Sequence, residues 1–279
     1  EEALDGFRAS LVDPWVGDAF PDRIPDVVFQ EFFFGPDDLA MHEQFLTEHY
    51  GLSWGRRKET MMKFAGHSFN RAGAPRRLEY WRLTHDDSAY LNGIVLHRLG
   101  HALAEIHYGL ANATVPQDWL KEAVGFFLSF EFLGRNIVTC SKFEPPEPKG
   151  GTSVGGTLKK REERKTGSEM RGLREVMAEV ALVGPPIDRL AITELFDFES
   201  PDIAKAWAFF EFFVREGGLE GQLWLRACGE AATKANGETG PFLASWRRAA
   251  AETFDLKGDA IADLEKRWQE WLSRTYPVP

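Results

Sequence analysis

Residues 97–101 read His-Arg-Leu-Gly-His and residues 119–122 read Trp-Leu-Lys-Glu, and these two stretches decide both the fold and the candidate site. Two histidines four residues apart lie on one face of a helix. A glutamate on a following helix could supply a third ligand, and three such side chains with one open position are how a catalytic metal ion is held. His97, His101 and Glu122 are therefore the predicted metal ligands.

Both stretches belong to segments that are apolar on most sides. The spacing predicts one helix over about 89–108 and a second over 117–133. A carboxylate such as Glu122 inside an apolar face is costly unless it is paired or bound to a metal. Gly100 costs about 1 kcal/mol of helix propensity relative to alanine, which indicates a packing reason or a site at that position.

A site without metal is the alternative interpretation of the same residues. The two histidines would then be core residues with satisfied hydrogen bonds, as an isolated His-x-x-x-His pair usually is. Arg98 would replace the charge of the ion and pair with Glu122 or Glu105. The pattern by itself leaves both interpretations open.

Working outward, the N-terminal part reads as strands and the C-terminal part as helices. Dense or alternating apolar runs predict strands over 27–34, 60–69 and 77–84, with a helix over 36–50. From residue 168 onward helical spacing predominates. The predicted helices there span 168–182, 201–216, 219–235, 241–253 and 259–275.

This pattern predicts a mainly helical α+β fold with a small N-terminal sheet. Its parts are a β-containing region over 1–84, the helix pair over 85–142, an exposed loop over 143–167 and a helical lobe over 168–279. They are expected to form one compact domain. In the last helix Leu264, Trp268, Trp271 and Leu272 recur at helical spacing and are predicted core residues.

The segment 143–167 is rich in glycine, proline and lysine and cannot bury much apolar surface. It is predicted to be a solvated insertion, with a partner-binding loop as the alternative.

The bulk composition excludes some classes of partner. The chain has 279 residues and a net charge of −10, which argues against nucleic acid because phosphate binding needs a basic face. No apolar run approaches the roughly 20 residues of a membrane span. Cys140 and Cys228 are the two cysteines, and they could form one disulfide or remain two thiols.

The two quoted stretches carry a family resemblance. Residues 95–102, Val-Leu-His-Arg-Leu-Gly-His-Ala, and 119–127, Trp-Leu-Lys-Glu-Ala-Val-Gly-Phe-Phe, resemble the gluzincin metallopeptidases, the thermolysin-like group, and within it the bacterial peptidase-MA-like set. Residues 203–210 and 263–272 extend the resemblance. It implies a small sheet, two active-site helices and a helical lobe with a cleft between them. It also implies that His97, His101 and Glu122 are zinc ligands, and that the protein is exported to the periplasm or beyond.

Three departures from the family pattern concern its chemistry. Arg98 occupies the position of the general base in H-E-x-x-H. Phe126 occupies the position where the family has a carboxylate that braces a ligand histidine. The family also uses a late His or Tyr to steady the oxyanion, whereas the last histidine here is His107 and the only tyrosine after Tyr108 is Tyr276.

The sequence therefore predicts a non-catalytic gluzincin homologue, a pseudo-peptidase with a binding or scaffolding role. Its cleft would take a peptide or a protein, zinc would be its possible cofactor, and no residue is assigned a catalytic role. One alternative is an active zinc hydrolase with a rearranged mechanism, in which Glu105 acts as base or as an additional ligand. Another is a structural subunit of a larger assembly.

Overall fold

The computed structural model describes residues 93–134 and 172–277 in full, together with the helix backbone 88–92, the strand backbones 29–33, 66–69 and 78–82 and a few positions between 40 and 48. One compact unit of the chain is Ile24–Val95 and the other contains Leu96–Pro279, so that the boundary between Val95 and Leu96 lies within one long helix.

The first unit contains three short strands. They are β1 (Phe29–Phe33), β2 (Gly66–Phe69) and β3 (Leu78–Arg82), and β3 lies between the other two, parallel to β1 and antiparallel to β2. Each strand falls inside one of the three segments predicted as strands. Most of the residues around them lie outside the described part, so the predicted α+β organisation of the N-terminal region stays a prediction.

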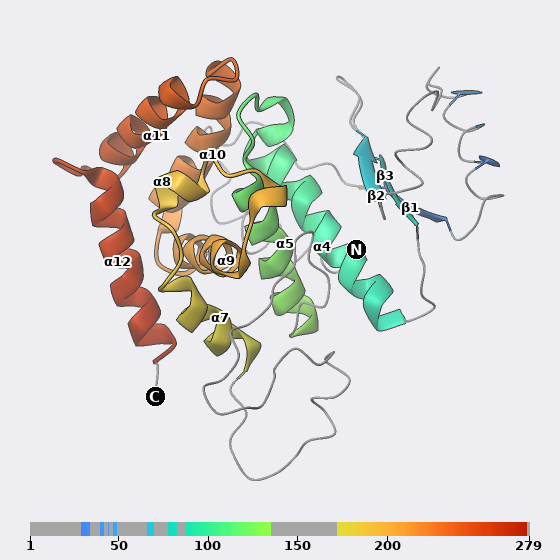
Figure 1. The fold of residues 1–279 in the computed structure, drawn as a ribbon, viewed down its shortest axis with the longest axis horizontal. Helices are drawn as coiled ribbons and strands as arrows, with labels where there is room; N and C mark the ends of the chain where they lie inside the picture. The colour runs from blue at the N-terminus through green and yellow to red at the C-terminus, as the bar shows by residue number, and fades with distance from the viewer. Residues whose placement is uncertain are drawn as a thin grey trace, which may run out of the picture. The chain divides into compact units, whose positions relative to one another are not determined.

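The second unit is built from helices, as Figure 1 shows. The described helices are α4 (Ser88–His107), α5 (Asp118–Leu133), α7 (Leu173–Ala181), α8 (Ile187–Leu190), α9 (Ser200–Arg215), α10 (Gly218–Lys234), α11 (Thr239–Thr253) and α12 (Ala260–Thr275), with 3-10 turns η3 (Leu110–Asn112) and η4 (Leu195–Asp197). For the part of the chain that the structure describes, the prediction of a mainly helical fold is thereby confirmed.

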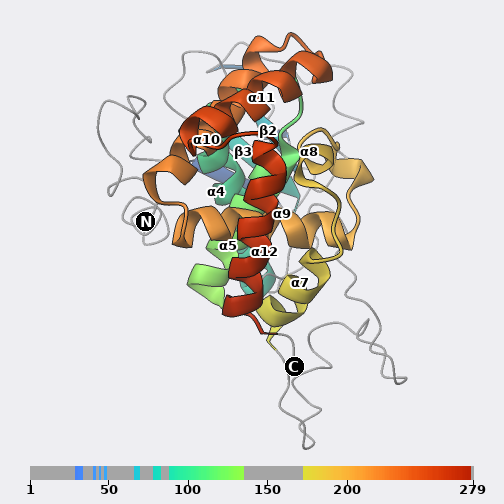
Figure 2. The same ribbon diagram turned by 90° about the vertical axis from the view of Figure 1, so that its left-hand side faces the viewer.

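Helix α9 is the centre of this unit. It contacts α5, α7, α10 and α12, and Figure 2 shows α12 crossing in front of it. Residues 202–213 of α9 are all buried, because other helices surround it. A helix in such a position is apolar on all sides. The polar exceptions have partners: Lys205 pairs with Glu265 of α12, and Glu211 accepts a hydrogen bond from Tyr276.

The core between α9 and the last three helices is aromatic. Trp224 of α10 stacks on Trp246 of α11 with ring centroids 5.0 Å apart, and it also contacts Phe209, Phe213 and Phe254. The four predicted core residues of α12 (Leu264, Trp268, Trp271 and Leu272) are at most 4% exposed, which confirms that prediction. Such rings bury large areas and dominate core energetics.

Helix ends follow local capping rules, with one correction. A serine followed by a proline is a typical helix start, and it would make Ser200 the N-cap before Pro201. The N-cap of α9 is Glu199, which forms a capping box with Asp202. Ser200 is instead the first helical residue. α5 ends at Gly134, whose φ of 64° lies in the left-handed region that favours glycine.

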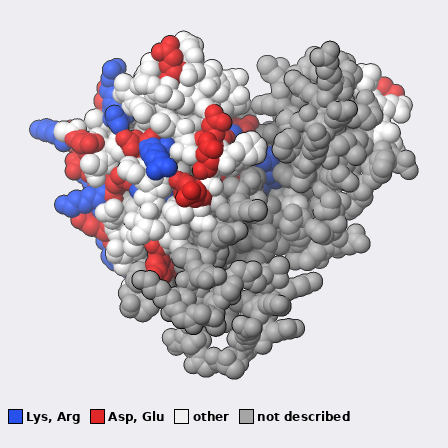
Figure 3. Space-filling model, viewed as in Figure 1, with Lys and Arg blue, Asp and Glu red and all other residues white. Residues whose placement is uncertain are grey.

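Several predictions lie outside the described residues. They include the loop 143–167, Cys140 and most of the predicted helix 36–50. Cys228 is a buried free thiol. No helix in the described part is long and apolar enough to cross a membrane, and on the face seen in Figure 3 its acidic and basic side chains are interspersed.

Candidate metal centre

The three predicted ligands meet in the interior of the helical unit. His97 and His101 lie one turn apart on α4, and Glu122 lies one turn into α5. Their exposed fractions are 0%, 5% and 0%. Within the described part of the chain they form a group of donor atoms that could hold a metal ion, and they are called the triad below.

The spacing of the donor atoms is compact. Nε2 of His97 lies 3.1 Å from Nε2 of His101 and 3.3 Å from Oε2 of Glu122. Nε2 of His101 lies 3.1 Å from Oε1 of Glu122. Ligands held about 2.0–2.1 Å from a tetrahedral divalent ion are about 3.3–3.4 Å apart, so the triad fits the size of such an ion.

The hydrogen bonding of the triad is also compatible with a metal site. Although the imidazole nitrogens approach the carboxylate of Glu122 closely, neither of its oxygens lies in hydrogen-bond geometry. The two Nε2 atoms, by contrast, lie within hydrogen-bond distance of each other. Among the described residues the carboxylate oxygens are thus buried without a hydrogen-bond partner, and a bound ion would compensate that burial.

The protonation states also suit coordination. Burial lowers the pKa of His101 to about 3, so its imidazole is neutral at pH 7. Burial raises the pKa of Glu122, but interactions with His97 and His101 outweigh it and hold that pKa well below its ordinary value. Metal ligands must be in these deprotonated forms, a neutral imidazole and an ionised carboxylate.

Two glycines bring α4 and α5 together at the triad. A Cβ on Gly100 would lie 2.5 Å from Cα of Gly125, and a Cβ on Gly125 would lie 2.8 Å from Nδ1 of His97. Neither helix could approach so closely with a larger residue at these positions. This gives Gly100 the packing reason that its place in the sequence indicated. Gly125 was not singled out from the sequence, although a second mid-helix glycine was the available signal.

Arg98, at the predicted general-base position, faces His101, the second predicted ligand. Its Nη1 lies 3.3 Å from Nδ1 of His101, one turn further along α4. A guanidinium only donates hydrogen bonds. The ring nitrogen that faces away from the triad is therefore contacted by a cationic donor, a feature that the sequence could not reveal.

The positions of the predicted brace and of the late tyrosine are also defined. The ring of Phe126 lies edge-on to the ring of His97, with centroids 5.6 Å apart, and it offers no acceptor for a ring N–H. The hydroxyl of Tyr276 donates to the carboxylate of Glu211, at 3.1 Å from Oε2. Tyr276 thus completes the packing of α9, and Glu105 is not a member of the group of donor atoms that the triad forms.

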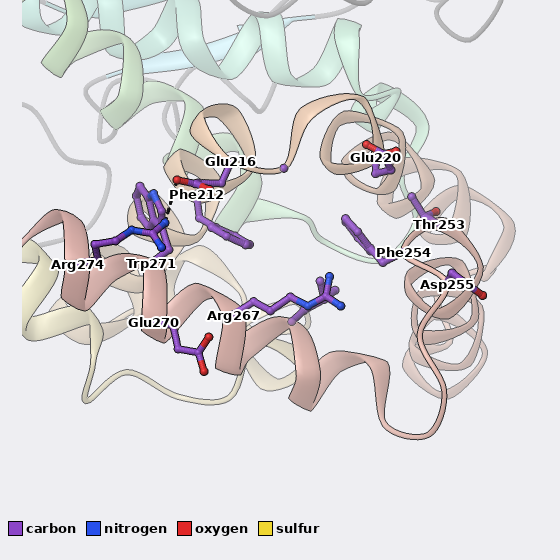
Figure 4. Close-up of a pocket in the computed structure, with 12 residues that line it drawn as sticks. Phe212, Glu216, Glu220, Thr253, Phe254, Asp255, Arg267, Glu270, Trp271 and Arg274 are labelled. Atoms are coloured by element: carbon purple, nitrogen blue, oxygen red, sulfur yellow. Dashed lines mark hydrogen bonds and ion pairs between the residues drawn. The ribbon is translucent and has the colours of Figure 1, made fainter.

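A separate cavity of about 550 Å³ lies among α9, α10, α11 and α12, and none of the triad lines it. Figure 4 shows Arg267 extending from α12 into the space between Phe212 and Phe254. Arg274 at the edge of this cavity is paired with Glu216, Nη2 to Oε1, at 3.0 Å. Its walls thus combine aromatic rings with charges of both signs.

No family model, curated protein or solved structure matches this chain. The functional interpretation therefore depends on the chemistry of the site itself.

Proposed function

We propose that this protein is a non-catalytic homologue of the gluzincin metallopeptidases, with a binding rather than a hydrolytic role. The observation that carries the proposal is the position of Arg98. A cationic side chain follows the first histidine, and its guanidinium contacts the ring of the second.

The chemistry of zinc hydrolysis explains why this position matters. Zinc held by two histidines and a glutamate supplies a hydroxide nucleophile near neutral pH, and in the H-E-x-x-H motif a glutamate takes the proton from the bound water. A guanidinium, which residue 98 supplies, has no site that accepts a proton at accessible pH values. It cannot accept that proton, and its charge opposes a divalent ion nearby.

Two further contacts support the same function. At the position where the family has a carboxylate that orients a ligand histidine, this chain has Phe126. The rings of Phe126 and His97 pack edge to face. Partners of ligand histidines are typically worth 10–100-fold in metal affinity or activity. Tyr276, the only tyrosine after the triad, donates its hydroxyl to Glu211. The base, the brace and the oxyanion donor are thus each replaced or engaged elsewhere.

A peptide hydrolysis assay tests this proposal. The full chain, supplied with zinc, is incubated with a mixture of peptides of diverse sequence, and products are sought by mass spectrometry. We expect no cleavage above that of a His97→Ala control. Cleavage that both a chelator and His97→Ala abolish would overturn the proposal.

The spacing of the triad favours one alternative, an active zinc hydrolase with a rearranged mechanism. Glu105, one turn beyond His101 on α4 and only partly buried, would then serve as the base. Metal analysis of the protein as purified separates the two functions. Less than a tenth of an equivalent of zinc would exclude the alternative, whereas stoichiometric zinc with activity lost in Glu105→Gln would establish it.

A further inference from the structure

We propose that Arg98 locks His101 in the tautomer that cannot bind a metal ion, so that a proton stands where the ion would be. This inference rests on the proposed function, because both treat the triad as a site with the geometry of a metal centre. It adds a specific role for Arg98, as a positioning residue that acts through His101.

The lock follows from which groups can donate. Nη1 of Arg98 lies 3.3 Å from Nδ1 of His101, and a guanidinium has donors and no acceptor. The contact is favourable only if Nδ1 presents its lone pair. In a neutral imidazole one nitrogen accepts and the other carries the proton, so the proton of His101 is placed on Nε2.

That proton points into the triad. Nε2 of His101 lies 3.1 Å from Nε2 of His97 and 3.1 Å from Oε1 of Glu122, so it can donate to the lone pair of His97 beside an ionised carboxylate. Without an ion, the two imidazoles are thus joined by a hydrogen bond beside the carboxylate. Their close spacing is compatible with this state as well as with coordination.

Metal binding requires the opposite tautomer. Coordination through Nε2 needs the lone pair there and moves the proton to Nδ1, where it would meet the N–H of Arg98. Ligand histidines ordinarily direct that second N–H at a carboxylate, a carbonyl or a water, which fixes the metal-binding tautomer. At this position Arg98 supplies a donor instead of an acceptor. An ion can therefore bind Nε2 of His101 only if the contact between Arg98 and Nδ1 breaks.

The experiment compares three substitutions in the full chain, stripped of metal and titrated with zinc by calorimetry. Arg98→Gln offers an amide oxygen to Nδ1–H, Arg98→Met has similar length but neither donor nor acceptor, and Arg98→Lys keeps the charge and the donors. We expect zinc affinity to rise at least about tenfold in Arg98→Gln, less in Arg98→Met, and little in Arg98→Lys. Circular dichroism checks that each variant is folded.

Equal zinc affinities of Arg98→Gln and Arg98→Met would overturn the lock, because charge alone would then explain the gain. So would a wild-type affinity equal to that of Arg98→Gln.

A second measurement needs no metal and no variant of Arg98. Nitrogen-15 NMR of the metal-free wild-type protein distinguishes the two histidine tautomers, and a His101→Asn variant assigns the signal. We expect the proton on Nε2 of His101. A proton on Nδ1, or on both nitrogens, would overturn the lock whatever the affinities are. Because neither measurement uses hydrolysis, the lock and the non-catalytic function can fail independently.

Discussion

The helical unit buries two clusters of opposite chemistry, the aromatic core around α10 and the triad between α4 and α5. Trp224 and Trp246 are fully buried and stack at 5.0 Å. The triad is buried to the same degree, yet its atoms are polar and one is charged. The aromatic core is stabilised by removing apolar surface from water. The triad is stabilised only by the electrostatic interactions among its own polar groups, which offset the cost of burying them.

This difference determines how the stability of each cluster responds when one of its side chains is replaced. An aromatic core loses stability in proportion to the volume removed, because its contacts are many and individually weak. A buried polar cluster fails when one member is removed, because the remaining groups keep their desolvation cost. Four predictions test this contrast, from the largest expected effect to the smallest.

Trp224→Ala should have the largest effect. It removes a fully buried ring that contacts Trp246, Phe209 and Phe213, and we expect a loss of about 4 kcal/mol in the free energy of unfolding. Urea denaturation measures it, with Trp224→Phe as the matched control that keeps an aromatic ring and should lose much less. A loss below about 1 kcal/mol would mean that the core is not packed as described.

Glu122→Leu should cost about 3 kcal/mol, because it leaves two buried imidazoles without their carboxylate. The informative control is the triple replacement in which His97→Leu and His101→Leu accompany it. We expect this variant to recover most of the loss, since an apolar cluster has no unpaired groups to desolvate. Urea denaturation of both variants tests the idea, and a triple variant less stable than Glu122→Leu would contradict it.

His107 should make stability depend on pH. Burial, aided by Arg226, lowers the pKa of His107 to about 4, whereas the unfolded chain has the ordinary value near 6.5. Between these values the unfolded state binds more protons, so stability falls as the pH is lowered. From pH 7 to pH 5 we expect this residue to contribute a loss of about 2 kcal/mol.

The comparison variant for this residue is His107→Phe, which keeps a ring beside Tyr108 and cannot titrate. Thermal unfolding of both proteins across this range measures the difference. Parallel pH profiles for the two proteins would refute the assignment to His107.

Lys234→Ala should have the smallest effect. Lys234 pairs with Glu230 at 3.2 Å, but the two side chains are 76% and 57% exposed. Exposed pairs within a helix are worth less than about 0.5 kcal/mol and are screened by salt. Unfolding at low and high salt should differ little between the variant and the wild type. A loss above about 1 kcal/mol would show that exposure does not set the value of ion pairs in this chain.

Much of the helical unit could be predicted from residue spacing. The seven longer helices, α4, α5, α7 and α9–α12, were each predicted within a few residues of where they lie, because an amphipathic period over several turns is a strong local signal. The short elements α8, η3 and η4 were missed. With three or four residues each, they are too short to show a period and are fixed by their neighbours.

The candidate site divides in the same way. Spacing placed His97 and His101 on one helix face, and the pattern of a metal site added Glu122 from the following helix. The sequence also showed that an arginine, which cannot accept a proton, follows the first histidine. It predicted Glu122 or Glu105 as the partner of Arg98 and could not show that the guanidinium also contacts the ring of His101, since several groups are within reach of a long side chain.

The sequence by itself determined the helices, the buried donors and the absence of a carboxylate after the first histidine. These properties reside in single residues or in periods along one segment. The tertiary structure decided how closely Gly100 and Gly125 bring α4 and α5 together, and that the guanidinium of Arg98 meets Nδ1 of His101. Side-chain direction and helix separation depend on packing between segments that are distant in the chain, and a sequence pattern does not contain that information.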